Sequence, residues 1–251
     1  MQPLNRREFQ GKLLGSVLTF GLIESLWSRG LFADEVKPDV DKWFRDLNSL
    51  GQDLKGQKLK DTEFQAKLEE LYKRVDLPSL LKFVDLDKIV EKVKIPDSGA
   101  FSAAFSLNQV EGLGNNVTFG KQIFCLKKGR AVVPHGHENM CTGFIVLRGS
   151  FRGRHFDRVE TQPEFYLIKP TIDRDFQAGG LSTVSDHKDN IHWFTCTSDT
   201  GFIFNAHFNG YDPAIKSPTG RLYLDPAGEK VDGGLIKAKK MSSGDCHKKY
   251  G

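Results

Sequence analysis

The sequence predicts a mainly β protein, an antiparallel barrel or sandwich, that is preceded by an α-helical region. After residue 98 the chain divides into seven or more short apolar segments separated by Gly, Asp and Pro, a spacing that is typical of all-β sandwiches and barrels. Helical periodicity does not recur between these segments, so a parallel α/β sheet is not expected. With 39% hydrophobic residues and 19 Phe, the 251-residue chain can bury a substantial core.

Residues 1–33 are predicted to be an export-signal-like segment. Arg6-Arg7 precede an apolar stretch of eleven residues, Leu13 to Ile23, which is too short to span a bilayer but has the length of a signal-peptide core. The pair followed by Glu8 and Phe9 resembles a twin-arginine signal. We therefore expect export to the periplasm. The alternative is an amphipathic helix that docks onto the domain of a cytoplasmic protein.

Residues 34–97 are predicted to be a helical lead-in. Apolar side chains recur every three or four positions in PDVDKWFRDLNSLGQDL and in TEFQAKLEELYKRV, and two shorter helical pieces follow. The Pro96–Gly99 cluster closes the region. We find no paired carboxylates and no metal-ligand spacing here, so we expect a covering layer or a contact between copies in a homo-oligomer.

Residues 98–235 are predicted to form the β-barrel domain, and residues 236–251 a basic, flexible, solvated tail. The formal net charge is only +4, and no basic stripe is interleaved with aromatic residues, so a nucleic-acid partner is not expected. The four cysteines form no CxxC pair, which excludes a zinc ribbon or a thioredoxin-like motif. The sequence leaves open whether one disulfide bond forms among Cys125, Cys141, Cys196 and Cys246.

Three histidines are the candidate metal ligands. In GRAVVPHGHENM, His135 and His137 lie two residues apart, so they share one face of an extended strand. His192 follows 55 residues after His137 and begins the aromatic segment HWFTC. Three neutral imidazoles from two strands can bind one divalent metal ion and leave positions open for substrate and for oxygen or water.

These segments resemble the motifs of the cupin superfamily, over roughly residues 115–210. The first motif is Gly-x5-His-x-His-x3–4-Glu-x6-Gly, and Gly129, His135, His137 and Gly149 match it. The second motif is matched by His192, whereas His187 and Asp189 take its usual Pro and Gly places and Cys196 takes that of Asn. The resemblance implies an antiparallel jelly-roll (cupin) barrel.

One departure from the first motif concerns its glutamate ligand, which is replaced by Thr142. The remaining three-histidine site is similar to that of the thiol dioxygenases among the cupins. The resemblance implies Fe(II) as the metal, with O2 and a small substrate, a thiol among the candidates. Mn, Ni, Cu and Zn remain open because they accept the same ligands. Glu138 and Cys141 are alternative ligands only if a bulge follows His137, because regular strand alternation turns them away.

Further residues are assigned to the pocket or to its surroundings. Phe144 and Phe194 share the inward parity and are expected to wall the pocket, although plain core residues would show the same pattern. Cys196 shares the parity of His192, with a buried inert thiol as the more ordinary state. His187 is expected to be a turn residue or a hydrogen-bond donor behind a ligand, and Asp189 a turn former that can orient a histidine.

Several residues stay unassigned, and three functions remain open. Arg152 and Arg154 are candidates for binding a substrate carboxylate, or lie on a solvated face. The two other lone histidines of the barrel region, His155 and His207, carry no assignment, and no catalytic residue is identified. The leading hypothesis is a mononuclear non-haem dioxygenase. The alternatives are a non-catalytic module that binds a small ligand, and a metal-dependent isomerase or lyase.

Overall fold

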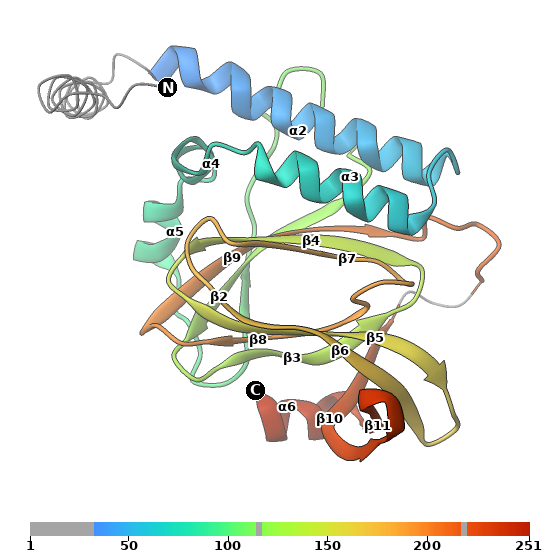
Figure 1. Cartoon of the computed structure of the whole chain (residues 1–251). Coiled ribbons are helices and arrows are strands. Elements are labelled where there is room, and N and C mark those ends of the chain that lie inside the picture. Colours follow the sequence, from blue (N-terminus) through green and yellow to red (C-terminus); the bar gives the residue numbers. More distant parts are fainter. Residues whose placement is uncertain (1–32, 114–116, 217–219) are drawn as a thin grey trace, which may run out of the picture.

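The computed structural model describes residues 33–113, 117–216 and 220–251. The predicted export segment therefore lies outside the described residues, apart from Ala33. The described chain forms a helical layer over one of two facing β-sheets, with the C-terminal helix on the opposite side (Figure 1). In this part of the chain, no helix is both long and apolar enough to cross a membrane.

The helical region predicted from the sequence is confirmed. It contains α2 (Ala33–Lys55), α3 (Asp61–Lys73), α4 (Leu77–Phe83) and α5 (Leu86–Lys92). Helix α3 begins with the Glu63 side chain accepting a hydrogen bond from the Lys60 backbone amide at 3.1 Å, and α4 begins with Asp76 accepting one from the Ser79 amide at 3.0 Å. Such caps satisfy amides that the first helical turn leaves without partners.

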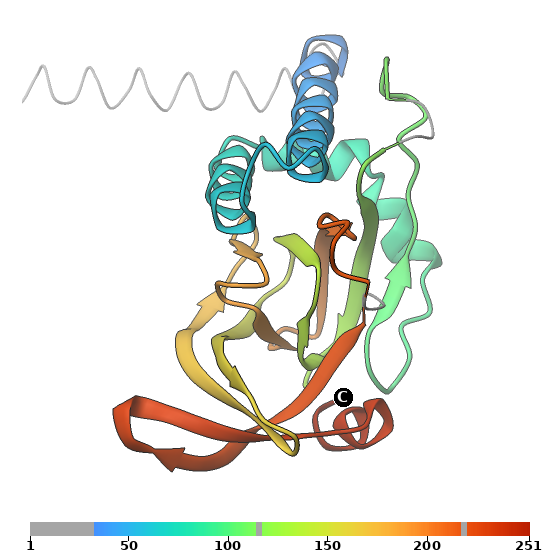
Figure 2. The ribbon, with the colours of Figure 1, turned by 90° about the vertical axis from the view of Figure 1, so that its right-hand side faces the viewer.

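The predicted antiparallel β class is also confirmed. The order β1-β2-β9-β4-β7 makes one sheet, and β10-β11-β6-β5-β8-β3 closes into a barrel. The strands are β1 (Phe101–Ala103), β2 (Gly120–Lys127), β3 (Ala131–His137), β4 (Met140–Arg148), β5 (Phe151–Thr161), β6 (Phe165–Phe176), β7 (Leu181–Val184), β8 (Ile191–Cys196), β9 (Thr200–Asn209), β10 (Arg221–Val231) and β11 (Leu235–Lys240). Figure 2 shows the two sheets curving around a common interior.

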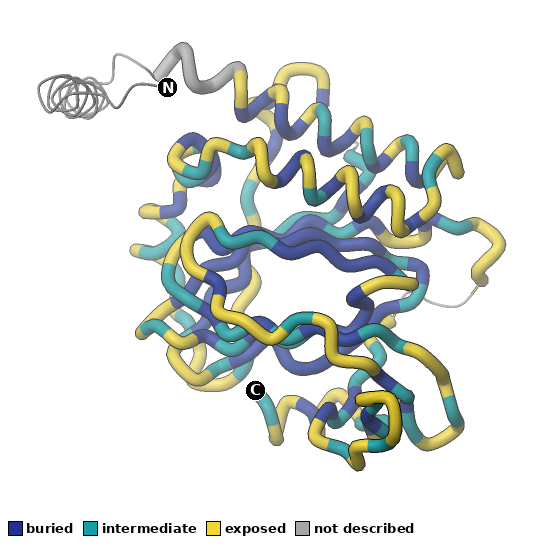
Figure 3. The backbone as a smooth tube through the Cα atoms, in the orientation of Figure 1, coloured by how far each residue is buried: buried dark blue, intermediate teal, exposed yellow. Residues whose placement is uncertain are grey.

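The five-stranded sheet is buried on both faces, which is why its central strands read as nearly continuous apolar runs. On β9, Phe204 and Phe208 pack against the helical layer, while Ile203 packs inside between the sheets. On β4, Ile145 faces the helices and Phe144 faces the interior. Figure 3 shows that the strands directly beneath the helical layer are mostly buried. The helices thus cover the outer face and leave the inner face to the site.

The C-terminal residues differ from the expectation of a flexible solvated tail. Residues 235–240 form β11, which pairs with β6 and β10 in the barrel, and Ser243–Tyr250 form helix α6. The alternation in LIKAKK places Ile236 and Ala238 in the core, while Lys237 and Lys239 lie on the opposite face of the strand. Cys246 of α6 is fully buried, which anchors the helix. The lysine content concealed this alternation.

The four cysteines are all buried and unbonded to one another. They lie in different places: Cys125 and Cys141 belong to the core under the helices, Cys196 to the interior core, and Cys246 to the C-terminal helix. No disulfide therefore holds this part of the chain together.

Candidate metal centre

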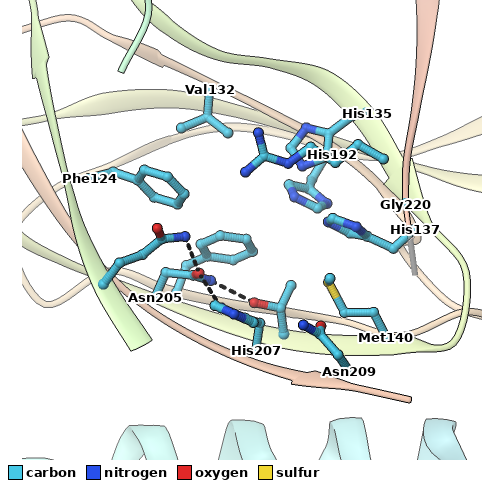
Figure 4. A pocket seen from close by; sticks show the side chains of 14 residues that line it. Phe124, Val132, His135, His137, Met140, His192, Asn205, His207, Asn209 and Gly220 are labelled. Carbon is cyan, nitrogen blue, oxygen red and sulfur yellow. Dashed lines mark hydrogen bonds between the residues drawn. The ribbon is translucent and has the colours of Figure 1, made fainter. Parts of the chain in front are cut away.

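Strands β3 and β8 bring the three predicted histidines together. His135 lies directly opposite His192 in the β3–β8 register, and alternation places His137 on the same face two residues on. The ring centroids are 4.3 Å apart for His135 and His192, 4.7 Å for His135 and His137, and 5.2 Å for His137 and His192. Each side chain is at most 4% exposed. Figure 4 shows the rings converging at one end of a cavity.

A sharp turn follows His137, the last residue of strand β3. Asn139 has a left-handed backbone with φ of 54°, so the chain turns directly after His137. The Asp186 carboxylate accepts hydrogen bonds from the backbone amides of Asn139 at 2.6 Å and Met140 at 3.2 Å. The turn directs Glu138 to an ion pair with Arg158, with 3.2 Å between Oε1 and Nη1. Glu138 is therefore not a ligand.

The hydrogen bonds behind the rings leave nitrogens facing the centre. His135 Nδ1 lies 2.7 Å from the Val133 carbonyl oxygen, and His192 Nδ1 lies 3.3 Å from that of Asn190. Because a carbonyl only accepts, both Nδ1 atoms carry the proton and both Nε2 atoms keep a lone pair. His137 Nδ1 is buried without a hydrogen-bond partner among the described residues. A metal ion would satisfy these nitrogens.

The protonation states also fit a metal. The pKa values of His135 and His137 lie well below the usual value and that of His192 is lowered to about 3, mainly by burial, and the charge of Arg221 acts in the same direction on all three. The rings are therefore neutral at neutral pH, which is the form that binds metals. One possible ligand nitrogen from each ring lies within 4.8 Å of the other two. We conclude that the triad is a candidate site for one divalent metal ion.

The triad forms one wall of a cavity of about 270 Å³. The other walls come from β2, β4, β9 and β10, and none of the described lining residues is acidic. The lining residues are Gln122, Phe124, Val132, His135, His137, Met140, Thr142, Phe144, His192, Asn205, His207, Asn209, Gly220 and Arg221. The cavity thus offers hydrogen-bond donors and a cation, together with the metal-binding nitrogens.

Three of the other predicted residues lie at or beside this cavity. Thr142 lines it, but its hydroxyl donates to the Ala206 carbonyl oxygen at 2.8 Å and serves the sheet rather than a metal. Phe144 also lines it, with its ring 5.1 Å from that of His192. Phe194 is packed behind Phe144, with the ring centroids 5.1 Å apart. Phe144 therefore belongs to the cavity wall, and Phe194 belongs to the hydrophobic core behind it.

Three predicted residues do not reach the cavity. His187 is 75% exposed and pairs with Asp61 of α3, with Nδ1 2.9 Å from the carboxylate. Asp189 has φ of 55° and turns toward Gln65, while Asn190, not Asp189, supplies the carbonyl oxygen behind His192. Cys196 packs in the interior core, with its Sγ 3.3 Å from the Ser198 carbonyl oxygen. His187 and Asp189 lie between β7 and β8, where strand alternation does not apply, so their directions could not be predicted. Cys196 lies in β8 and is the buried thiol that the sequence indicated.

The fold also shows where the remaining candidates lie, which are Cys141, Arg152 and Arg154. Cys141 faces the helical layer, as regular alternation predicts. Arg152 lies on the outer face and pairs with Asp173 at 2.7 Å and Asp175 at 3.2 Å. The Arg154 guanidinium stacks 4.4 Å from the Trp193 ring centroid. The solvated-face interpretation of the two arginines is therefore the correct one.

Sequence reasoning missed two functional side chains on the far walls. His207 lies on β9, opposite Thr142 in register, and shares the inward parity of Asn205. That alternation in FNAHFN was a usable signal. Arg221 begins β10, opposite His137, and no motif or periodicity marks it.

Acid is expected to destabilise the metal-free protein through its buried histidines. Burial lowers the pKa of His155 to about 3, whereas an unfolded imidazole has a pKa of about 6.5. Below about pH 6.5 the unfolded state therefore binds the proton and the folded state does not, so stability falls as pH falls. This histidine alone should contribute a slope of about 1.4 kcal/mol per pH unit. Urea unfolding in chelator at several pH values between 5 and 7 measures it. An unchanged slope in His155→Phe would contradict the expectation.

The comparisons with known proteins concern the fold alone. No family model matches the chain, and no curated protein matches its sequence. A solved protein of Klebsiella pneumoniae, described as uncharacterized with a double-stranded β-helix domain, is 10% identical, with 54% of this chain and 87% of that chain covered and a TM-score of 0.37. A cupin superfamily protein of Desulfitobacterium hafniense is 13% identical, with 47% of this chain and 84% of that chain covered and a TM-score of 0.31.

An oxalate oxidase in complex with the substrate analogue glycolate is 13% identical, with 51% of this chain and 56% of that chain covered and a TM-score of 0.35. This chain's own strands confirm the mainly β fold with a barrel, and the three histidines predicted as candidate metal ligands lie close together. The chain resembles the cupin superfamily in its fold class and in a candidate three-histidine metal site.

Proposed function

We propose that the protein is a mononuclear non-haem Fe(II) dioxygenase that acts on a small anionic substrate, with thiols as the leading class. The observation that carries the proposal is a cluster of three neutral, buried imidazoles without a carboxylate ligand. Neutral ligands leave a divalent ion with its full positive charge, which favours binding of an anionic donor beside O2. Bound Fe(II) would supply the redox chemistry.

The cavity supports the anionic character of the substrate. Arg221 lines it, and the described lining residues include no acidic side chain that would neutralise the guanidinium. A guanidinium is suited to bind a carboxylate through paired hydrogen bonds. The volume of about 270 Å³ lies just below the range of drug-sized pockets, so it supports a small-molecule substrate.

Oxygen consumption tests the proposal. The protein is loaded anaerobically with Fe(II), exposed to O2 and assayed with small thiols, with and without a carboxylate, and with their hydroxy analogues. We expect uptake with at least one thiol and transfer of label from ¹⁸O-enriched dioxygen to the product. His137→Ala, treated in the same way, should show none.

Two other outcomes would contradict a dioxygenase. Isomerisation or cleavage of a panel compound without oxygen uptake would indicate the isomerase or lyase class. Tight binding of a panel compound by the iron-loaded protein, with no chemical change, would indicate a ligand-binding module. Export and homo-oligomerisation are separate proposals, and they await fractionation of cells and measurement of the mass in solution.

A further inference from the structure

A series of hydrogen bonds crosses the cavity wall opposite the triad. It begins at Thr142, whose hydroxyl donates its only proton to the Ala206 carbonyl oxygen at 2.8 Å. The Thr142 oxygen can then only accept, and it accepts from Asn205 Nδ2 at 2.6 Å. The same Nδ2 lies 3.3 Å from the Gly143 carbonyl oxygen. Two acceptors on one side therefore fix the orientation of the Asn205 amide.

The amide orientation in turn fixes a proton on His207. Asn205 Oδ1 faces the other way, where it accepts from Gln122 Nε2 at 3.2 Å and lies 3.3 Å from His207 Nδ1. Figure 4 shows these contacts along the cavity wall. Because an amide oxygen only accepts, Nδ1 must carry the proton of the neutral ring. The lone pair is then on His207 Nε2.

This lone pair remains available. Burial and the charge of Arg221 lower the pKa of His207, and His137 is the other titratable group that interacts with it. Within the described chain, Nε2 makes no hydrogen bond. Gly120 leaves room for it, because a Cβ at that position would collide with Nε2. His207 is thus a neutral hydrogen-bond acceptor among the residues that line the cavity.

We propose that His207 is a substrate-binding residue whose Nε2 accepts a hydrogen bond from an O–H or N–H group of the substrate, and that Asn205 and Thr142 are the positioning residues that fix its tautomer. The inference rests on the proposed function in one respect, which is that the substrate occupies this cavity. It narrows the substrate class to small metal-binding anions that also carry a hydrogen-bond donor.

The tautomer is tested without metal or substrate. Long-range ¹H–¹⁵N spectra of the ¹⁵N-histidine-labelled full chain distinguish protonated from unprotonated ring nitrogens, and His207→Gln assigns the signal. We expect a protonated Nδ1 and an unprotonated Nε2 in the wild type at neutral pH. In Asn205→Asp the added negative charge should raise the pKa of His207 and protonate both nitrogens. A protonated Nε2 in the wild type would overturn the inference.

Ligand selectivity tests the binding role. The Co(II)-loaded protein is titrated with 2-mercaptoethanol and with its methyl ether, which lacks the hydroxyl donor, and binding is read from the sulfur-to-cobalt absorption band. The wild type should prefer the hydroxyl compound by about five- to tenfold, since one hydrogen bond is at stake. His207→Phe should bind cobalt and lose the preference.

The outcomes separate the two proposals. If the protein binds no cobalt, the proposed function is contradicted. If it binds cobalt but shows no preference for the hydroxyl compound, only the inference about His207 is contradicted. Retention of the preference in His207→Phe would also overturn it. If His207→Phe does not fold, the wild-type preference and the tautomer still decide.

Discussion

Replacing His192 by alanine is expected to abolish the stabilisation of the protein by a divalent metal ion. An ion that binds only the folded state stabilises it by about 2.7 kcal/mol at a concentration 100 times its Kd. His192 lies opposite His135 and completes the triad, so two ligands remain and the affinity should fall steeply. Urea unfolding in chelator and in excess Co(II) gives the increment for each protein.

His155→Ala is the matched control. Strand β8 pairs with β3 on one side and with β5 on the other. His155 lies opposite His192 in β5 and is 0% exposed. Its ring hydrogen bonds to Ser182 Oγ at 3.1 Å, and it is not part of the ligand cluster. Both substitutions remove a buried imidazole, but only His192→Ala should remove the metal increment. Equal increments in the two variants would contradict the assignment of His192.

Phe204→Ala is expected to cause a large loss of stability. The side chain is 0% exposed on the helix-facing side of β9. Its ring centroid lies between 5.7 and 6.3 Å from those of Trp43, Phe44, Tyr72 and Phe105. Truncation therefore leaves a cavity where the helical layer meets the sheet, which typically costs about 3–5 kcal/mol. Urea unfolding of the metal-free protein measures the change.

Phe101→Ala gives the comparison for this substitution. Phe101 lies at the edge of the same sheet but is 41% exposed, so its truncation should change the free energy of unfolding by less than about 0.5 kcal/mol. Similar losses in both variants would show that the helices do not depend on the aromatic contact with β9.

The candidate metal ligands could be predicted from short sequence motifs. His135 and His137 obey strand alternation within one segment, and His192 matches the histidine of the second cupin motif. The same alternation correctly turned Cys141 toward the helices. The helical region was predictable from its periodic apolar positions. Each of these inferences rested on a pattern within a short segment of the sequence.

The rest of the site depends on contacts between distant segments. Arg221 enters the cavity because β10 pairs with the end of β3, and no local pattern encodes that pairing. Asp189 turns away because its backbone is left-handed at φ of 55°. The expectation of a flexible C-terminal tail was wrong because its lysines conceal the alternation that buries Ile236 and Ala238.

Metal content measured by mass spectrometry tests the central claim most directly. The full-length wild type, His135→Ala, His137→Ala, His192→Ala and His155→Ala are loaded with one divalent ion under identical conditions and freed of excess metal. We expect one ion per chain in the wild type and in His155→Ala, and nearly none in the three triad variants. A wild type without metal, or a triad variant that retains a full equivalent, would contradict a three-histidine metal centre.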